Sequence, residues 1–286
     1  MNTILISGIS GFLGSELAKY FMNDYNIIGL KRSSSKVSRI PDANNVILYD
    51  LDYTDLEEIF KQNSIDFVIH TAALQGKNIS TTSELIDTNI SFSVRMAEVS
   101  KLYGVKAFIF SDTLLPKKSN LYALSKFHAR KWIKKFSSND MKIINMRLEL
   151  FFGEKEDAEQ FIKSITLKML ENILFLDFTE GRQQRDIIYI DDVVNAYATV
   201  IRHINEFKFY ESVDVGSGNP IELKKFIEKI KMITNSKTIL NFGKIPYSKN
   251  DPMYVCAKND ILNKLGWSAL VSMDDAIARM VKELQP

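Results

Sequence analysis

Tyr122 and Lys126, in the segment NLYALSK, are the residues of this sequence best suited to proton transfer. Residues four apart share one face of a helix, so the phenol and the amine would lie about one turn apart. With 11 Tyr and 37 basic residues, chance supplies roughly one such pair, and a second copy does occur at Tyr254 and Lys258. The surroundings of each copy must therefore separate a proton-transfer pair from two ordinary helical residues.

The surroundings of the first copy, Tyr122 with Lys126, favour a role in proton transfer. It follows a predicted strand, AFIFS at 107–111, and no such strand precedes the second copy. A phenol with an ordinary pKa of about 10 needs a nearby cation to work near neutral pH, and Lys126 supplies one. Lys126 could also bond a nicotinamide ribose, and the hydroxyl of Thr113 could bind a substrate carbonyl. We expect Thr113, Tyr122 and Lys126 to be catalytic; an exposed helical pair is the alternative.

A glycine-rich segment, GISGFLG, joins the first predicted strand at 3–7 to a helix at 13–22. Glycines at such a turn let backbone amides approach a pyrophosphate at the amino terminus of the helix. We expect a dinucleotide here, and the alternative is a turn that needs glycine only for tight packing. The residues assigned to the cofactor are Gly8, Ser10, Gly11, Phe12, Leu13 and Gly14.

The end of the second predicted strand indicates which dinucleotide binds. An acidic side chain there would bond the ribose 2′-hydroxyl and repel a 2′-phosphate, but residues 27–40 contain no Asp or Glu. Lys31, Arg32 and Ser33 instead offer two cations and a hydroxyl, which suit a phosphate dianion. We therefore expect NADP(H); the alternative is a solvated basic loop.

Two more strand ends are predicted to contact the cofactor, YDLD after the third strand and HTAA after the fourth. The first Asp of YDLD could accept from the adenine amino group while the Leu covers the ring, or it could be a solvated loop residue. The residues after His70 are small enough for ribose and phosphate to lie close to the backbone. His70 itself is expected to be a satisfied strand-end histidine. These assignments add Asp50, Leu51, Thr71, Ala72 and Ala73.

The motifs lie on alternating elements. Short β-branched runs alternate with amphipathic stretches through the first half, including a helix that Thr54 should cap. This alternation is typical of an α/β fold with a Rossmann-type, doubly wound parallel sheet. A strand is expected near 212–215, and the later helices are expected at 161–170, 193–204, 221–234 and 274–284.

Two lobes are expected from this order of elements. A dinucleotide-binding Rossmann domain would comprise residues 1–152 and 187–216. A smaller, carboxyl-terminal substrate-binding lobe would comprise residues 153–186 and 217–286.

Composition excludes several classes of function. A formal net charge of +2 gives no field for nucleic acid or a membrane surface. One cysteine and three dispersed histidines, at 70, 128 and 203, predict neither a disulfide framework nor a metal site. Neither a targeting segment nor a long apolar window is recognisable, so we expect a cytoplasmic protein.

The chain resembles the extended short-chain dehydrogenase/reductases that act on nucleotide sugars. The resemblance covers nearly the full length and rests on GISGFLG, YDLD, HTAA, Asn89, SDT, YALSK, MRLELFFG, RQQRDIIYIDDVVNAY and LGW. It implies a cofactor role for Asn89 and Arg185 as a ligand of the substrate diphosphate; a structural ion pair, with Asp186 for example, is the alternative for Arg185. It also implies a homodimer through the helices at 84–103 and 121–136, whose apolar faces could equally pack on the sheet.

Departures from the family pattern reduce the number of reactions that this chain could catalyse. Dehydratases of the family carry Asp-Glu directly after the catalytic Thr, but Leu114 and Leu115 stand here, and leucines cannot exchange protons. Only eight residues separate Thr113 from Tyr122, which predicts a more open pocket wall. A substrate-contacting Asn of the family is Leu150 here.

The resemblance and the motifs together predict an NADPH-dependent C4 ketoreductase. Its substrate would be a CDP- or dTDP-linked 4-keto-6-deoxyhexose, or the 3,6-dideoxy form, and its product would serve surface polysaccharide. The alternatives are a C4 epimerase with tightly bound NAD and a non-catalytic NADP(H) sensor. Sensors often lose the Tyr or the Lys, and this chain has both.

Overall fold

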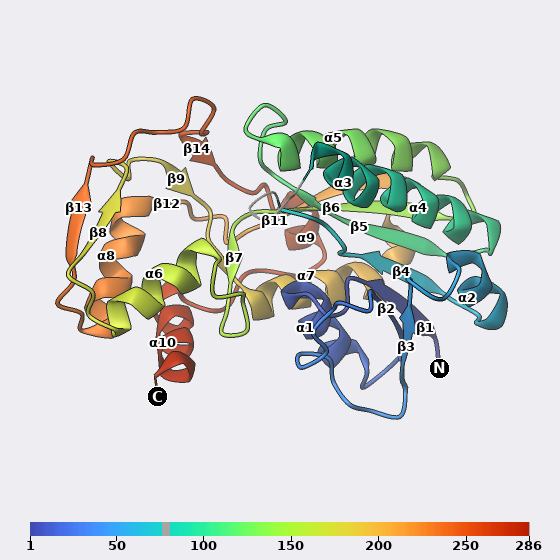
Figure 1. The fold of residues 1–286 in the computed structure, drawn as a ribbon. Coiled ribbons are helices and arrows are strands. Elements are labelled where there is room, and N and C mark those ends of the chain that lie inside the picture. The colour runs from blue at the N-terminus through green and yellow to red at the C-terminus, as the bar shows by residue number, and fades with distance from the viewer. Residues whose placement is uncertain (76–80, 286) are drawn as a thin grey trace. The chain divides into compact units, whose positions relative to one another are not determined.

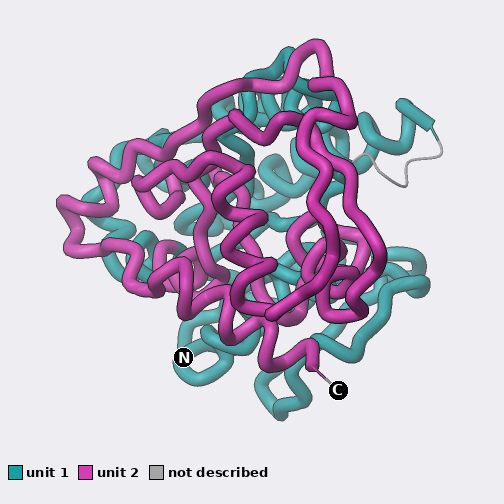
Figure 2. Tube along the Cα trace, turned by 90° about the vertical axis from the view of Figure 1, so that its left-hand side faces the viewer, with its two compact units in different colours: residues 1–147, 197–213 teal, residues 148–196, 214–286 magenta. Residues whose placement is uncertain are grey.

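The computed structural model describes residues 1–75 and 81–285. These residues divide into two compact units, 1–147 with 197–213 and 148–196 with 214–286 (Figure 2). The lobes expected from the sequence have boundaries that differ from these by three to ten residues, the largest difference being 187 in place of 197. The separate functions expected of the two lobes stay a prediction.

Within the described residues, seven strands form one sheet in the order β11-β6-β5-β4-β1-β2-β3 (Figure 1). β1 pairs in parallel with β2 and β4, β2 with β3, and β4 with β5. The α/β class and the Rossmann-type sheet are thereby confirmed. The bounds are β1 Thr3–Ser7, β2 Asn26–Lys31, β3 Val46–Asp50, β4 Phe67–His70, β5 Ala107–Thr113, β6 Lys142–Leu148 and β11 Tyr210–Val215.

Helices cover both faces of the sheet, because successive strand residues point to opposite faces and both sets are apolar. In β1, Leu5 belongs to a core that it shares with α2, α4 and α5, while Ile4 and Ile6 are also fully buried. α1 lies on the other side of the sheet from α4 and α5 (Figure 1). The bounds are α1 Phe12–Phe21, α2 Leu56–Gln62, α3 Thr82–Ile86, α4 Phe92–Leu102, α5 Leu121–Ile133 and α7 Ile190–Arg202.

One local expectation needs correction and another needs detail. The cap of α2 is Asp55, not Thr54, because the Asp55 carboxylate accepts the Glu57 amide hydrogen at 2.8 Å. The helix expected at 84–103 is present, and a π-helical turn at Asp87–Ser91 lies within it, between α3 and α4. This turn carries Asn89 inward.

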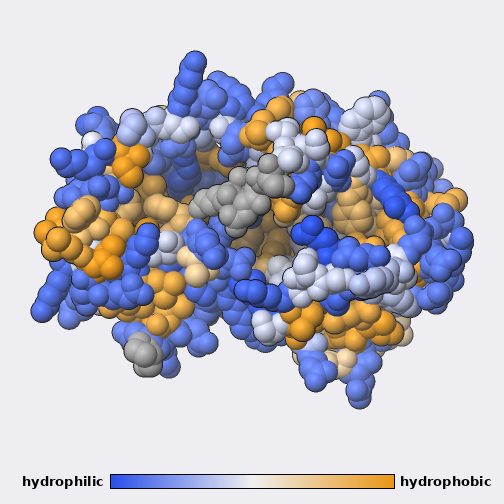
Figure 3. Space-filling view, viewed as in Figure 1, coloured by the Kyte–Doolittle hydropathy of each residue, from blue (hydrophilic) through white to orange (hydrophobic). Residues whose placement is uncertain are grey.

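The second unit combines short strand pairs with three longer helices. β7 pairs with β10, β8 with β13, and β9 with both β12 and β14. Figure 3 shows apolar side chains over β8 and β13, where Phe175 and Ile239 are about half exposed. The bounds are β7 Phe151–Phe152, α6 Phe161–Leu170, β8 Phe175–Phe178, β9 Gln184–Arg185, β10 Ile188–Tyr189, β12 Ile221–Glu222, α8 Leu223–Thr234, β13 Ile239–Phe242, β14 Tyr254–Val255, α9 Asp260–Lys264 and α10 Met273–Leu284.

Candidate active site

Tyr122 and Lys126 lie together on α5, at the end of β5. Asn120 begins the helix, because its side chain accepts the Ala123 amide hydrogen at 2.8 Å. Lys126 is 1% exposed, and its Nζ donates to the Ser111 carbonyl oxygen at 2.8 Å. The same Nζ lies 5.9 Å from the centre of the Tyr122 ring. The structure thus places an ammonium group beside the phenol, in a buried setting.

The electrostatics of the pair differ from the sequence expectation for the phenol. Burial lowers the pKa of Lys126 to about 8, and the nearby Asp112 carboxylate partly opposes this shift. The pKa of Tyr122 is raised, first by burial and then by Asp112. Burial and Asp112 therefore both favour the protonated form of the phenol.

A buried network below the pair was missed by the sequence reasoning. Asp112, on β5, is 2% exposed and accepts hydrogen bonds from Arg130 Nη1 at 2.5 Å and Asn145 Nδ2 at 3.0 Å. Its other oxygen accepts the Thr113 amide hydrogen at 2.8 Å. Arg130 follows Lys126 by four residues, so Tyr122, Lys126 and Arg130 share one face of α5. That spacing was the only sequence signal for the network.

Thr113 lies at the carboxyl end of β5 and is partly exposed. Its Oγ1 accepts the Leu115 amide hydrogen at 3.2 Å. Among the described residues it donates its own hydroxyl hydrogen to none. Leu114 and Leu115 follow it and are partly exposed, so no titratable side chain occupies these two places.

The second Tyr-Lys copy lacks the geometry of the first. Tyr254 lies on β14 and is 61% exposed. Residues four apart on extended chain do not face each other as they do on a helix. The pair is therefore a chance match, as the sequence context indicated.

The glycine loop has the shape that a dinucleotide needs. Gly8 has φ +72°, and a Cβ there would lie 2.8 Å from the Ala72 nitrogen. A Cβ on Gly14 would lie 2.2 Å from the Gly8 oxygen, so both glycines are required for the packing of the turn itself. Gly11 is different: it is exposed, it occupies the N-cap of α1, and a Cβ there would meet the Gly8 oxygen at 3.2 Å. With no acidic side chain in the first turn of α1, this end of the helix fits an anionic pyrophosphate.

The other predicted loop residues gather at the same strand ends. Gly8 and Thr71 follow adjacent strands, β1 and β4, and Thr71 Oγ1 donates to the Ser7 carbonyl oxygen at 2.7 Å. A sheet whose strand order reverses between two neighbours has a crevice at that point, where α/β proteins bind nucleotides. Ser10, Phe12, Leu51, Ala72 and Ala73 are partly exposed, and Leu13 is buried.

The basic cluster after β2 is partly neutralised. Lys31 Nζ and Ser33 Oγ each lie 2.8 Å from the same oxygen of Asp50. The hydrogen bond from Lys31 lowers the pKa of Asp50. Arg32 is exposed and, among the described residues, forms no ion pair. One guanidinium therefore remains for a 2′-phosphate where the sequence suggested two cations.

Asn89 and His70 both use their polar atoms within the protein. Asn89 is fully buried, and its Nδ2 donates to the Leu74 oxygen and to Ser125 Oγ, each at 2.9 Å. Asn89 thereby connects the chain after β4 to α5. His70 is buried between Ser7 Oγ at 2.6 Å and Ser93 Oγ at 2.7 Å, and burial lowers its pKa to about 3. It is a neutral structural histidine.

Arg185 lies in the second unit and is 8% exposed. Its Nη2 donates to Asp251 Oδ1 at 2.6 Å. Asp186, the partner considered from the sequence, binds elsewhere: it accepts from Ser217 Oγ at 2.5 Å and from the Ala257 amide at 2.9 Å. Leu150 is partly exposed, and its carbonyl oxygen accepts the Ile188 amide hydrogen at 3.0 Å.

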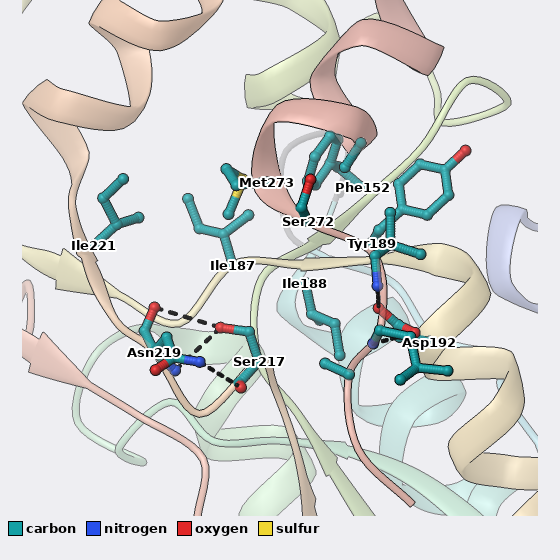
Figure 4. A pocket seen from close by; sticks show the side chains of 14 residues that line it. Phe152, Ile187, Ile188, Tyr189, Asp192, Ser217, Asn219, Ile221, Ser272 and Met273 are labelled. Atoms are coloured by element: carbon teal, nitrogen blue, oxygen red, sulfur yellow. Dashed lines mark hydrogen bonds between the residues drawn. The ribbon is translucent and has the colours of Figure 1, made fainter.

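The second unit also contains a cavity of about 280 Å³. Figure 4 shows mostly apolar side chains around it, with Asp192, Ser217, Asn219 and Ser272 among the polar members. These polar groups are already engaged, Asp192 with the amides of Leu270 and Val271. None of the predicted site residues lines this cavity.

Residues 1–75 and 81–285 contain neither a membrane-spanning helix nor a group of metal ligands. No helix there is both long enough and apolar enough to span a bilayer. Within the same ranges, no three His, Cys, Asp or Glu side chains are grouped as metal ligands would be.

The sheet order, the glycine turn and the tyrosine-lysine helix define a Rossmann-type enzyme of the short-chain dehydrogenase/reductase kind. Residues 4–216 match the family described as "NAD dependent epimerase/dehydratase family". The chain belongs to this family, as the resemblance indicated.

Individual relatives cover almost the whole chain. It is 32% identical to CDP-abequose synthase of Salmonella muenchen, over 97% of this chain and 96% of the relative. It is 28% identical to dTDP-4-dehydro-6-deoxyglucose reductase of Escherichia coli, over 99% and 98%. The fold matches UDP-glucuronic acid 4-epimerase from Bacillus cereus, solved with UDP-glucuronic acid and NAD, with a TM-score of 0.87, 20% identity and coverage of 99% and 98%.

Proposed function

We propose that this chain is an NADPH-dependent ketoreductase acting at C4 of a CDP- or dTDP-linked 4-keto-6-deoxyhexose, the 3,6-dideoxy form included. The product would be a deoxysugar nucleotide for surface polysaccharide such as lipopolysaccharide or capsule. The observation that carries the proposal is the phenol of Tyr122 with its ring centre 5.9 Å from the buried Nζ of Lys126. Two relatives are named for deoxysugar nucleotides of these kinds.

The roles of the residues follow from their hydrogen-bonding capacity. A bound reduced nicotinamide supplies the hydride. Thr113 can donate its hydroxyl hydrogen to the substrate carbonyl oxygen, because that hydrogen has no acceptor among the described residues. Tyr122 donates its proton to the same oxygen as negative charge develops there. The ammonium of Lys126 then stabilises the phenolate that remains.

The protonation states suit reduction better than oxidation. An acid must carry its proton when the reaction begins, and burial and Asp112 both keep the proton on Tyr122. A general base would need the opposite shift in pKa. The leucines at 114 and 115 leave no acid and base for eliminating water.

The preference for NADP(H) rests on Arg32. Its exposed guanidinium suits a 2′-phosphate, while Lys31 is committed to Asp50. We expect Arg32→Ala to raise the KM for NADPH about tenfold, as for one lost charged contact, with little change for NADH. An unchanged KM for NADPH would refute the assignment.

A C4 epimerase is the second candidate, favoured by the pairing of Lys31 with Asp50 and by a solved neighbour that holds NAD. An epimerase keeps its cofactor through both half-reactions. Purified protein should then release NAD(H) on denaturation, whereas a ketoreductase exchanges its cofactor at each turnover. The test is to identify the nucleotide in the denatured supernatant.

The function is tested by mixing NADPH with a panel of CDP- and dTDP-linked 4-keto-6-deoxyhexoses and following absorbance at 340 nm. We expect loss of absorbance with at least one of them and a reduced sugar nucleotide as product. Binding of NADPH without turnover of any substrate in the panel would favour the alternative, a non-catalytic NADP(H) sensor.

The assembly and location are also proposals. Leu102 on α4 and Leu121 and Trp132 on α5 are more than half exposed, which suits a homodimer through these helices. Light scattering after gel filtration should give twice the mass of one chain, and the mass of a single chain would remove the proposal. A cytoplasmic location is consistent with a substrate made from cytoplasmic nucleotides.

A further inference from the structure

A carboxylate lies at the end of β2, although β2 itself supplies none. Lys31 is the last residue of this strand, and the strand contains neither Asp nor Glu. In the parallel register of β2 and β3, Asp50 pairs with Lys31 and is the last residue of β3. The neighbouring strand therefore brings an acidic side chain to the place where a dinucleotide-binding fold distinguishes a ribose 2′-hydroxyl from a 2′-phosphate.

The Asp50 carboxylate holds two of the groups that could bind a 2′-phosphate. Lys31 Nζ and Ser33 Oγ both donate to Asp50 Oδ2, each at 2.8 Å. Asp50 Oδ1 accepts the backbone amide hydrogen of Asp52 at 3.1 Å, which fixes the carboxylate in place. The side chains of Lys31 and Asp50 are only 19% and 21% exposed. A partly buried ion pair is screened less than a surface pair, so Lys31 stays engaged.

The charges at this strand end cancel. The cations of Lys31 and Arg32 are matched by the carboxylates of Asp50 and Asp52, and Asp52 accepts the Ser33 backbone amide hydrogen at 2.9 Å. A 2′-phosphate beside Ser33 would gain from the exposed Arg32 and would be repelled by the two carboxylates. A ribose hydroxyl would meet no such repulsion, and it could donate its hydrogen to a carboxylate oxygen.

We infer that Asp50 determines cofactor specificity: its carboxylate withholds Lys31 and Ser33 from a 2′-phosphate and offers an acceptor to a 2′-hydroxyl, so that NADH can serve beside NADPH. This role rests on the proposed function, because that function places a nicotinamide dinucleotide at the end of β2. It differs from the adenine contact expected of Asp50 from the sequence. The preference for NADPH that remains is the one charged contact of Arg32, about tenfold.

Calorimetric titration with NADPH and with NADH, at one ionic strength, tests this role. For the unmodified protein, the Kd for NADH should be about ten times the Kd for NADPH. Asp50→Asn keeps the shape of the side chain and an oxygen that can accept from Ser33, but it releases Lys31. This variant should bind NADPH about tenfold more tightly, the effect of one more charged contact. Its affinity for NADH should not rise, because NADH has no phosphate at this position.

Two further variants separate the release of Lys31 from a change in overall charge. Asp52→Asn removes the same charge two residues away and leaves the Lys31–Asp50 pair intact, so it should gain clearly less affinity for NADPH than Asp50→Asn. Adding Lys31→Met to Asp50→Asn should abolish the gain, because no ammonium group is then left to meet the phosphate.

Asp66→Asn is the matched distant control. Asp66 resembles Asp50 in its contacts, since it pairs with Lys106 Nζ at 2.7 Å, accepts the Thr3 amide hydrogen at 2.8 Å and has a side chain that is 19% exposed. It directly precedes β4 and contacts the first residue of β1, so it lies at the opposite ends of these strands from the glycine turn. Both affinities should stay those of the unmodified protein.

Unchanged affinity for NADPH in Asp50→Asn, or an equal gain in Asp52→Asn or Asp66→Asn, would overturn the role of Asp50. A preference for NADPH above about 100-fold in the unmodified protein would overturn it too, and each of these results would leave the ketoreductase proposal standing. Failure to bind either dinucleotide would overturn both. The expected affinities without reduction of any 4-keto sugar nucleotide would uphold Asp50 and count against the proposed reaction.

Discussion

Replacing Arg130 by Met should destabilise the protein and shift the pH dependence of catalysis. The side chain of Asp112 is 1% exposed and that of Arg130 is 22% exposed. Removing the guanidinium leaves a buried carboxylate with hydrogen bonds from Asn145 and the Thr113 amide. Breaking one side of a buried ion pair costs about 3–5 kcal/mol. Because those two hydrogen bonds remain, we expect the low end, about 3 kcal/mol.

The measurement is urea unfolding of the unmodified protein, Arg130→Met, Asp112→Asn and the double variant. Residues in one network couple by roughly 0.5–3 kcal/mol, so the double variant should lose less than the sum of the two singles. In a thermal scan, a loss of about 3 kcal/mol corresponds to roughly 6–10 °C for a chain of this size. Arg95→Met is a control, since Arg95 pairs with Asp55 while both side chains are more than half exposed, and should cost about 1 kcal/mol or less.

Asp112→Asn and Arg130→Met should shift the alkaline limit of the pH profile of kcat in opposite directions. Lys126 has a pKa of about 8, lowered by burial and raised by Asp112. Asp112→Asn removes the raising influence, so the alkaline fall in kcat should move to lower pH. Arg130→Met leaves Asp112 without its counterion, so the fall should move to higher pH. Shifts of the same sign, or a loss below about 1 kcal/mol in Arg130→Met, would refute this account of the network.

Three further predictions concern single positions. Glu149 has a native pKa of about 8 against an ordinary 4.5, so its contribution to stability is full below pH 4.5 and is lost as pH rises to 8. In urea unfolding at pH 9, Glu149→Gln should therefore be more stable than the unmodified protein, by on the order of 4 kcal/mol. Equal free energies of unfolding at pH 9 would contradict this. Gly14→Ala should cost at least about 2 kcal/mol in urea unfolding, because the new Cβ would lie 2.2 Å from the Gly8 oxygen. Gly11→Ala should cost clearly less, because its Cβ would lie 3.2 Å from the same oxygen. Equal costs would contradict the packing argument. Tyr254→Phe should leave kcat within about twofold, since Tyr254 is exposed on β14. A large loss of kcat in steady-state kinetics would mean that the second Tyr-Lys pair takes part in catalysis.

Local patterns predicted most of the sheet and its glycine turn. β1, β2, β4, β5 and β6 are short, largely buried apolar runs, and a glycine at positive φ follows β1 directly, so a window of a few residues contains the signal for each of them. The edge strand β3 is different, because Ile47 and Leu48 in it are exposed. The cap of α2 was placed one residue early, because Thr54 and Asp55 are both good caps and only the fold selects the carboxylate. The π-helical turn at Asp87–Ser91 has no periodic signal of its own.

The polar partners could not be predicted, because they join residues far apart in sequence. Asp112 meets Asn145 across 33 positions, and Arg185 meets Asp251 across 66. Charge alone suggested Asp186 for Arg185, but Asp186 binds backbone amides on another segment. The upward shift of the Tyr122 pKa could not be predicted for the same reason, since burial and Asp112 cause it and neither is visible in the spacing of Tyr122 and Lys126.

The most direct test of the central claim is single-turnover reduction by Tyr122→Phe, with NADPH bound and a 4-keto-6-deoxyhexose nucleotide added. The variant should bind NADPH as the unmodified protein does, because the aromatic ring remains, and lose most of its activity, because the phenolic proton is absent. A variant that binds NADPH normally and reduces the substrate at an unchanged rate would contradict the claim that Tyr122 donates the proton.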